Sequence, residues 1–171
     1  MTKLSPMKNV VMLATIHQYQ MSGNDAGSEL RKCLDYLRSR FKAQKTVELQ
    51  TVMEEWSKEL GETVVKEFAT KSGLHWASVG TPDEPRLRTY LPAATYPGHN
   101  GTLRPDHGAP PLCEYGPFQN QEAREKRIVQ NVRAEMENYE SGIFVLGLAH
   151  MHSVFKKLQS SGFKVYGYSC L

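Results

Sequence analysis

The sequence predicts an α/β protein, a three-layer sandwich in which a mainly parallel sheet of about five strands carries helices on both faces. Three observations lead to this prediction. Short apolar, β-branched runs alternate with amphipathic helical segments along the chain. The two most apolar runs are typical of strands that are covered on both sides. Strands that are joined through helices form right-handed crossovers, which make neighbouring strands parallel.

The elements follow from the spacing of apolar residues. Strands are predicted over 9–16, 46–53, 75–79, 142–149 and 164–168, of which the first and fourth are the most apolar. Helices are predicted over 25–41, 59–72, 120–139 and from 152 to about 162. Asp25 is the expected N-cap of the first helix, and Gly73 and Gly162 follow two others as stop signals. We expect a single domain over residues 1–171.

The segment from about 80 to 119 is different, because most of the prolines and many glycines fall there. It is predicted to be an irregular loop. Loops of this length in compact domains are often lids or binding loops, and a disordered excursion is the alternative.

Composition and charge narrow the classes of partner and location. The formal net charge is only +3, and no basic run is interleaved with aromatic residues, so nucleic acid is not the expected partner. No apolar run approaches the roughly 20 residues that cross a bilayer, so no membrane partner is expected. We recognise no export signal, and Cys33, Cys113 and Cys170 are widely scattered. This pattern favours reduced thiols in a cytoplasmic protein over a disulfide framework.

Titratable side chains follow three of the predicted strands. His17 comes directly after the first strand, Glu54 and Glu55 after the second, and His150 and His152 after the most apolar one. In a parallel sheet the carboxyl ends of the strands meet at one edge, where ligands bind. The sequence therefore predicts a site at this edge that combines imidazoles and carboxylates.

Two kinds of chemistry fit that site. A divalent metal such as zinc, manganese or cobalt would be held by His17, Glu55, His150 and His152 and would activate a water molecule. Without a metal, the catalytic residues would be His17, Glu54, Glu55 and His150, with a histidine or glutamate as the general base. His150 is the first choice, and His152 is either a second ligand or the group that fixes the tautomer of His150.

Plainer interpretations accompany each of these residues. A single histidine at the end of a strand is more often structural than functional, and two adjacent glutamates allow at most one to point inward. Glu54 and Glu55 would otherwise begin a solvated helix. Arg124 and Arg127 lie one turn apart; they bind an anionic group, pair with Glu54 or Glu55, or belong to a solvated helix face, which is the commoner case.

The chain resembles the TraB/TIKI group and the wider superfamily of erythromycin esterases and ChaN-like proteins. Gly147-Leu148-Ala149-His150 matches the closing Gly-x-x-His motif of these proteins, and Ala14-Thr15-Ile16-His17 matches the opening motif except that Ala14 replaces its glycine. Small bacterial stand-alone members are similar in order as well: Thr15-Ile16-His17-Gln18-Tyr19-Gln20, Glu54-Glu55, Arg86 or Arg88, and Arg124-Glu125 before the closing motif. The resemblance runs from about residue 9 to 168 and leaves out the predicted loop.

The resemblance implies hydrolysis. TIKI-type members resemble metal-dependent proteases, and members of the erythromycin-esterase type resemble metal-free lactone hydrolases that use histidine and glutamate. It also implies a role for Arg88, beside Arg124 and Arg127, in binding a small-molecule or peptide substrate. The leading hypothesis is a water-activating hydrolase, and the alternative is a non-catalytic binding or regulatory module on the same fold.

Overall fold

The computed structural model describes residues 6–21, 26–44, 47–55, 62–80 and 119–170. Its elements in chain order are β1 (Asn9–Thr15), α1 (His17–Gln20), α2 (Ala26–Gln44), β2 (Thr51–Glu54), α3 (Val64–Ser72), β3 (His75–Ser78), α4 (Gln119–Glu135), β4 (Ser141–Gly147), the 3-10 helix η5 (Leu148–His150), α5 (Met151–Ser160) and β5 (Lys164–Ser169). The predicted loop over about 80–119, which contains Arg88 and is the predicted lid, lies outside the described residues.

The five strands form one parallel sheet in the order β3-β2-β4-β1-β5. β4 is the central strand, and β1 and β2 flank it. Thr15 at the end of β1 pairs with Gly147, and Glu54 at the end of β2 pairs with Val145. The carboxyl ends of these three strands therefore lie side by side, as the sequence predicted.

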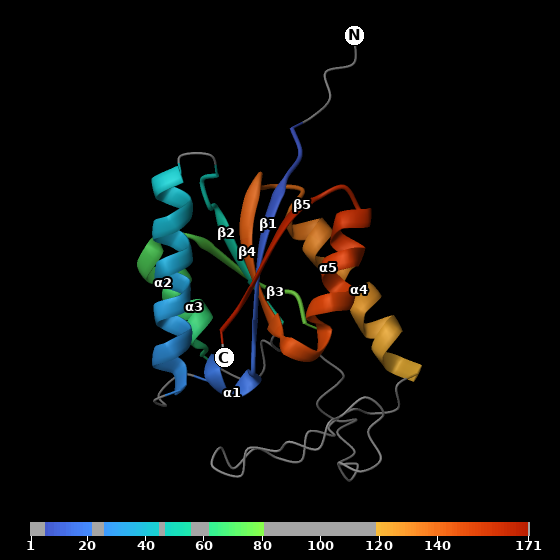
Figure 1. Cartoon of the computed structure of the whole chain (residues 1–171), viewed down its shortest axis with the longest axis horizontal. Coiled ribbons are helices and arrows are strands. Elements are labelled where there is room, and N and C mark those ends of the chain that lie inside the picture. The colour runs from blue at the N-terminus through green and yellow to red at the C-terminus, as the bar shows by residue number, and fades with distance from the viewer. Residues whose placement is uncertain (1–5, 22–25, 45–46, 56–61, 81–118, 171) are drawn as a thin grey trace.

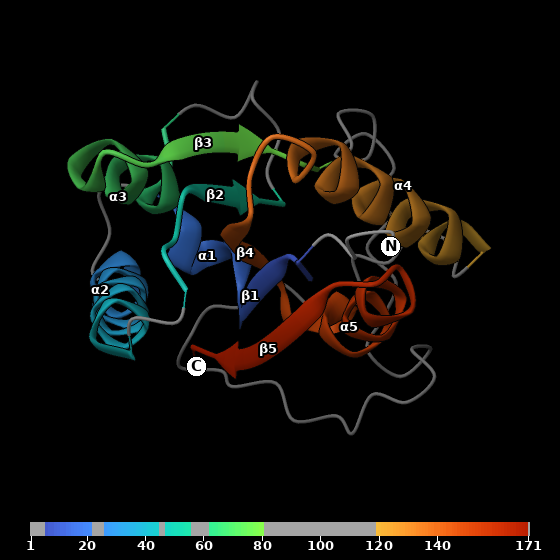
Figure 2. The same cartoon turned by 90° about the horizontal axis from the view of Figure 1, so that it is seen from above.

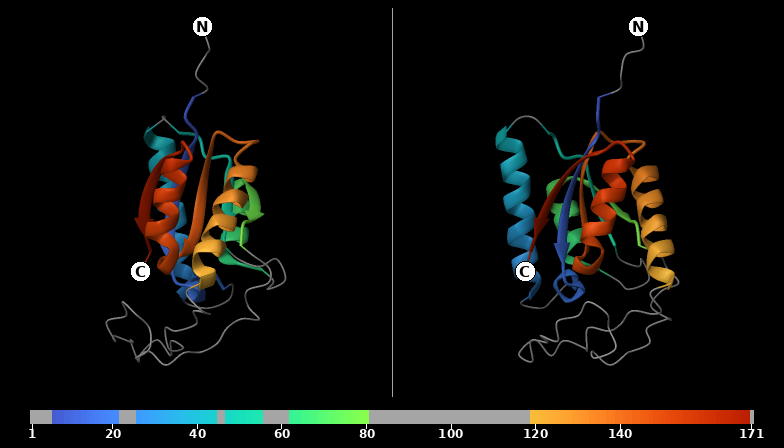
Figure 3. Two further views of the ribbon diagram at one scale, coloured as in Figure 1. Left: turned by 90° about the vertical axis from the view of Figure 1, so that its right-hand side faces the viewer. Right: turned by 45° about the vertical axis from the view of Figure 1, so that its right-hand side comes forward.

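Helices cover both faces of the sheet (Figures 1 and 2). Val11 and Leu13 of β1 pack in one buried cluster with α2 and α3. Their neighbours Val10 and Met12 pack in a second cluster with α4 and α5. Because successive side chains of a strand point to opposite faces, these two clusters are the two sides of one sheet. The predicted three-layer α/β sandwich is confirmed, and the views in Figure 3 show the same layers.

Local chemistry explains where α3 begins and ends. The side chain of Thr63 accepts a hydrogen bond from the backbone N–H of Lys66 and so caps the amino end. Gly73 has φ of +68° at the carboxyl end, where its N–H bonds back to the last turn. Only glycine adopts this left-handed conformation without cost.

Several elements differ from the sequence-based prediction. α2 ends at Gln44 rather than at residue 41, and α3 begins at Val64 rather than at residue 59. β2 begins at Thr51 rather than at residue 46, because only from Thr51 onward does it pair with both β3 and β4. β4 ends at Gly147, and His150 closes the 3-10 turn that follows instead of following the strand directly. α4 ends at Glu135 rather than at residue 139. Among the described helices, none is both long and apolar enough to cross a membrane.

Candidate functional site

The backbone positions of the predicted site residues lie close together at the carboxyl edge of the sheet. His17 begins α1, two residues beyond Thr15, and His150 lies three residues beyond Gly147, the strand partner of Thr15. Glu54 ends β2, beside β4. The side chain of His17 lies outside what the structure describes, so its proposed contact with His150 stays a prediction.

Glu54 and Glu55 are both buried, and they point to opposite sides of the sheet. Glu54 is fully buried and faces α1 and α3, whereas Glu55 is 2% exposed and faces α4 and η5. This follows from the alternation of side chains along β2. Both carboxylates are buried, and of the two it is Glu55 that lies beside His150.

The imidazole of His150 lies between two carboxylates. Its Nδ1 is 3.0 Å from Oε1 of Glu125, and its Nε2 is 3.5 Å from Oε1 of Glu55. All three residues are almost completely buried, each 2% exposed. Glu125 Oε2 also accepts a hydrogen bond from the hydroxyl of Ser153. Together with Arg124, these four residues are called the His150 cluster below.

Neighbouring cations and a backbone amide compensate the two carboxylates. Arg124 donates to Oε1 of Glu55 at 2.9 Å, and the N–H of Gly147 donates to Oε2 at 2.9 Å. Lys157 places its Nζ 3.6 Å from Oε2 of Glu125. Buried carboxylates need such partners, because an unpaired charge in the interior is strongly unfavourable. The interpretation of Arg124 as part of a solvated face is therefore wrong, and its pairing with Glu55 is confirmed.

Two members of the cluster, Glu125 and Ser153, were not selected as site residues from the sequence. Glu125 entered only through the Arg124-Glu125 resemblance, and Ser153 did not enter at all. A signal was available in the periodicity of α4. Glu125 precedes the buried residues Ile128 and Val132 by three and seven positions, which puts its carboxylate on the apolar face of the helix. A charged residue on that face needs a partner, and here the partner is His150.

A second cluster surrounds Glu54 and consists of Gln20, Glu54, Thr63 and Trp76. Gln20 donates to Oε2 at 2.9 Å, while Trp76 Nε1 at 2.9 Å and the Thr63 hydroxyl both donate to Oε1. Burial raises the pKa of Glu54 above its ordinary value, and these three hydrogen bonds lower it in part. The Glu54 cluster ties β2 to α1, α3 and β3.

Other predicted residues lie apart from the His150 cluster. His152 is exposed and lines an open groove of about 540 Å³ between α4 and α5, together with Arg133 and Lys156. Residues 150 and 152 point in different directions because they lie two positions apart at the start of a helix. Arg127 is exposed on α4, as in the solvated-face interpretation. Glu125 occupies the position at Nδ1 of His150 that was considered for His152.

The His150 cluster meets some of the requirements of a metal centre. Two ligands at roughly 2.0 to 2.2 Å from a tetrahedral zinc lie about 3.3 to 3.6 Å apart, a range that includes the 3.5 Å between His150 Nε2 and Glu55 Oε1. However, the same Glu55 oxygen accepts from Arg124, whose cation opposes a second one. Among the residues that the structure describes, no group of three or more His, Cys, Asp or Glu side chains is placed to hold a metal ion. On their own these residues do not make a metal centre.

The same arrangement suits acid–base chemistry. The carboxylate of Glu125 at Nδ1 orients the imidazole ring, and Nε2 faces Oε1 of Glu55 at 3.5 Å. Leu148 and Ala149, the other two residues of η5, are exposed, so the turn that carries His150 lies at the surface edge of the sheet.

Comparison of the chain with protein-family models, curated proteins and solved structures finds no match.

Proposed function

We propose that this protein is a hydrolase in which His150 activates a water molecule at the carboxyl edge of the sheet. The observation that carries the proposal is the position of the His150 imidazole between two carboxylates. Glu125 contacts Nδ1, and Glu55 lies 3.5 Å from Nε2. The substrate class is a small-molecule ester or lactone, or a peptide amide. The resemblance to the erythromycin-esterase and ChaN-like superfamily supports the same class of reaction.

Each member of the cluster has a role in this proposal. His150 takes a proton from water through Nε2 as the water oxygen attacks the carbonyl carbon, and then passes the proton to the leaving group. Glu125 is a positioning residue that orients the ring. Glu55 stabilises the protonated imidazole, and Arg124, the cluster's partly exposed cation, offsets negative charge that develops on the substrate oxygen.

Fewer observations support a metal-dependent form of the same function. His150 and Glu55 would be two of the ligands, and the remaining ones would come from outside the described side chains, His17 being the candidate. The metal would supply a bound hydroxide at neutral pH. Titration of the purified chain with Zn²⁺, Mn²⁺ and Co²⁺, followed by calorimetry, tests this form independently of any substrate.

The test of the proposal is a matched pair of histidine variants assayed on p-nitrophenyl esters, chromogenic lactones and fluorogenic peptides. His150→Gln should lower kcat/KM on any substrate that the wild type turns over by about 100-fold or more, which is the usual contribution of a general base. His75→Gln is the control, because His75 also pairs with a glutamate, Glu135 at 2.7 Å, but at the amino end of β3. Equal activity of the two variants would contradict the proposal.

A non-catalytic binding or regulatory module is the second candidate, and one observation favours it. His150, Glu55 and Glu125 are almost completely buried, and Arg124 and the neighbouring Lys157 compensate the two carboxylates, as in a network that supports a binding surface. If no substrate in the panel is turned over and no metal binds, while a ligand from the same panel raises the melting temperature of the wild type, the binding module is the better account.

A further inference from the structure

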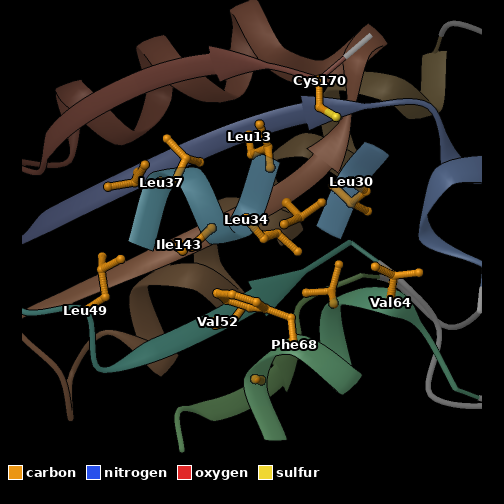
Figure 4. Close-up of a cluster of buried hydrophobic side chains, with 14 of the residues drawn as sticks. Leu13, Leu30, Leu34, Leu37, Leu49, Val52, Val64, Phe68, Ile143 and Cys170 are labelled. Carbon is orange, nitrogen blue, oxygen red and sulfur yellow. The ribbon is translucent and has the colours of Figure 1, made fainter. Parts of the chain in front are cut away.

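Two cysteines that lie far apart in the sequence meet beside the face of the sheet that α2 and α3 cover. Cys33 belongs to α2, and Cys170 directly follows β5. Their Sγ atoms are 2.6 Å apart although 137 positions separate the residues. Figure 4 shows Cys170 next to Leu13 and close to Leu30 of α2, at the margin of the buried cluster.

Separate elements hold the two side chains in place. The backbone N–H of Cys170 donates to the carbonyl of Ala14 at 2.8 Å, which continues the pairing of β5 with β1 beyond the last strand residue. Cys33 is packed against the cluster that contains its α2 neighbours Leu30 and Leu34. Neither sulfur depends on a loop for its position, so the pair is preformed.

We propose that Cys33 and Cys170 form a reversible disulfide that fastens the edge strand β5 to α2. A disulfide needs the sulfur atoms about 2.05 Å apart, so closure moves them by roughly half an ångström. This inference stands apart from the proposed function, because neither cysteine belongs to the His150 cluster.

A small disulfide such as glutathione disulfide is the oxidant, and the step balances as thiol–disulfide exchange. The Cys33 thiolate attacks one sulfur of the small disulfide and releases one small thiolate. The Cys170 thiolate then attacks Cys33 Sγ and displaces the second. The products are the Cys33–Cys170 bond and two small thiols, which receive the two protons that the cysteines lose.

Exposure and acidity favour this order of attack. Cys33 is half-buried, whereas Cys170 is 3% exposed. Burial, with a further contribution from the neighbouring Cys33, raises the pKa of Cys170 to about 12. Because the thiolate is the nucleophile, Cys33 is the residue that meets the small disulfide first.

The bond would act at one edge of the sheet. Among the described strands, β5 lies at the edge and pairs with β1 alone, and its residues are exposed or half-buried. A link across 137 positions also constrains the unfolded chain strongly. Oxidation should therefore raise the melting temperature and slow the detachment of β5.

The experiment uses the reduced full-length chain, equilibrated with mixtures of glutathione and glutathione disulfide, then alkylated and digested with trypsin. The expected product is peptide 33–38 joined to peptide 165–171, lighter by two hydrogen atoms than the separate peptides. Cys113, in peptide 89–124, should stay alkylated under the same conditions. Recovery of peptides 33–38 and 165–171 unlinked, each alkylated or carrying glutathione, across the whole series would overturn the proposal.

Variants supply the functional control. Cys33→Ser and Cys170→Ser should each lose the rise in melting temperature that oxidation causes in the wild type, and Cys113→Ser should keep it. The peptide measurement on the wild type needs no variant, so it decides the outcome even if a serine substitution prevents folding. A linked peptide that contains Cys113 in place of Cys33 or Cys170 would also refute the pairing.

Discussion

Two adjacent glutamates at the end of β2 show how environment separates side chains of the same kind. Glu55 has a guanidinium and a backbone N–H on its carboxylate, whereas Glu54 has three neutral donors, from Gln20, Thr63 and Trp76. Neutral donors offset less of the cost of burying a charge than a paired cation does. Burial raises the pKa of Glu54, so its ionisation should be visible in the stability of the protein.

The pKa shift of Glu54 makes a prediction for Glu54→Gln. In the unfolded chain the Glu54 carboxyl has a pKa of about 4.3, and in the folded protein its pKa is higher. Between the two values the folded state binds more protons than the unfolded state, so the free energy of unfolding falls as the pH rises, by at most about 1.4 kcal/mol per pH unit. The variant lacks this group and should lose this pH dependence.

Urea unfolding of both proteins from pH 4 to pH 8 measures the effect. The stability of the wild type relative to Glu54→Gln should be highest at the acid end, fall through the window between the two pKa values and then stay level. The glutamine can keep the oxygen that accepts from Thr63 and Trp76, and Gln20 can rotate its amide to accept from the new NH₂ group. A constant difference, or one that grows with pH, would show that the pKa of Glu54 is not raised.

The sequence supported the positions of these residues better than their partners. Placing Glu54, Glu55 and His150 at the ends of strands needed only apolar periodicity and the geometry of parallel sheets. Glu125, not His152, contacts Nδ1 of His150. This contact depends on the rotation of α4 about its axis and on the 3-10 turn after β4. A short turn carries no periodic pattern, so the direction of His150 was not available from the sequence.

At the scale of elements, the long periodic segments were predicted well, whereas the two shortest helices were not predicted. α2 and β4 follow from runs of apolar residues that are long enough to show a period. α1 and η5, of four and three residues, were not predicted. Yet α1 places Gln20 on Glu54 and η5 places His150 on Glu125, so short elements orient both polar clusters.

Packing between the central strands makes a prediction for Gly142→Ala. A Cβ on Gly142 of β4 would lie 2.7 Å from Cγ2 of Thr51 and 3.1 Å from the backbone oxygen of Thr51, both in β2. Such overpacking costs about 1 to 3 kcal/mol. The free energy of unfolding should fall by that amount, measured with urea at neutral pH.

A double-mutant cycle provides the control for this clash. Thr51→Ser removes the methyl group that the added Cβ at position 142 would meet first, so it should restore part of the stability lost in Gly142→Ala. Additive effects of the two substitutions would mean that β2 and β4 do not approach each other as closely here as the structure indicates.

At the scale of the whole molecule, one topological fact organises the fold and the candidate site. β4 lies between β1 and β2, so segments that are more than ninety positions apart in the sequence end at the same edge. The parallel three-layer fold was predictable, because covered strands alternate with amphipathic helices. The hydrolase proposal stays a prediction, since a fold of this kind hosts many functions and chemistry is decided by the site.

The same topology predicts how stability is distributed over the sheet. β4 is buried along its whole length and has a strand on each side, whereas β3 and β5 each have one neighbour and half-buried or exposed residues. Hydrogen exchange is slowest where backbone amides open only on global unfolding. Exchange followed by mass spectrometry, with a reductant present to keep Cys33 and Cys170 as thiols, should therefore show β4 and β1 protected longest and β3 and β5 shortest. If β5 exchanged as slowly as β4 under reducing conditions, the strand order proposed for that edge would be wrong, because a strand with one neighbour can detach without unfolding the core.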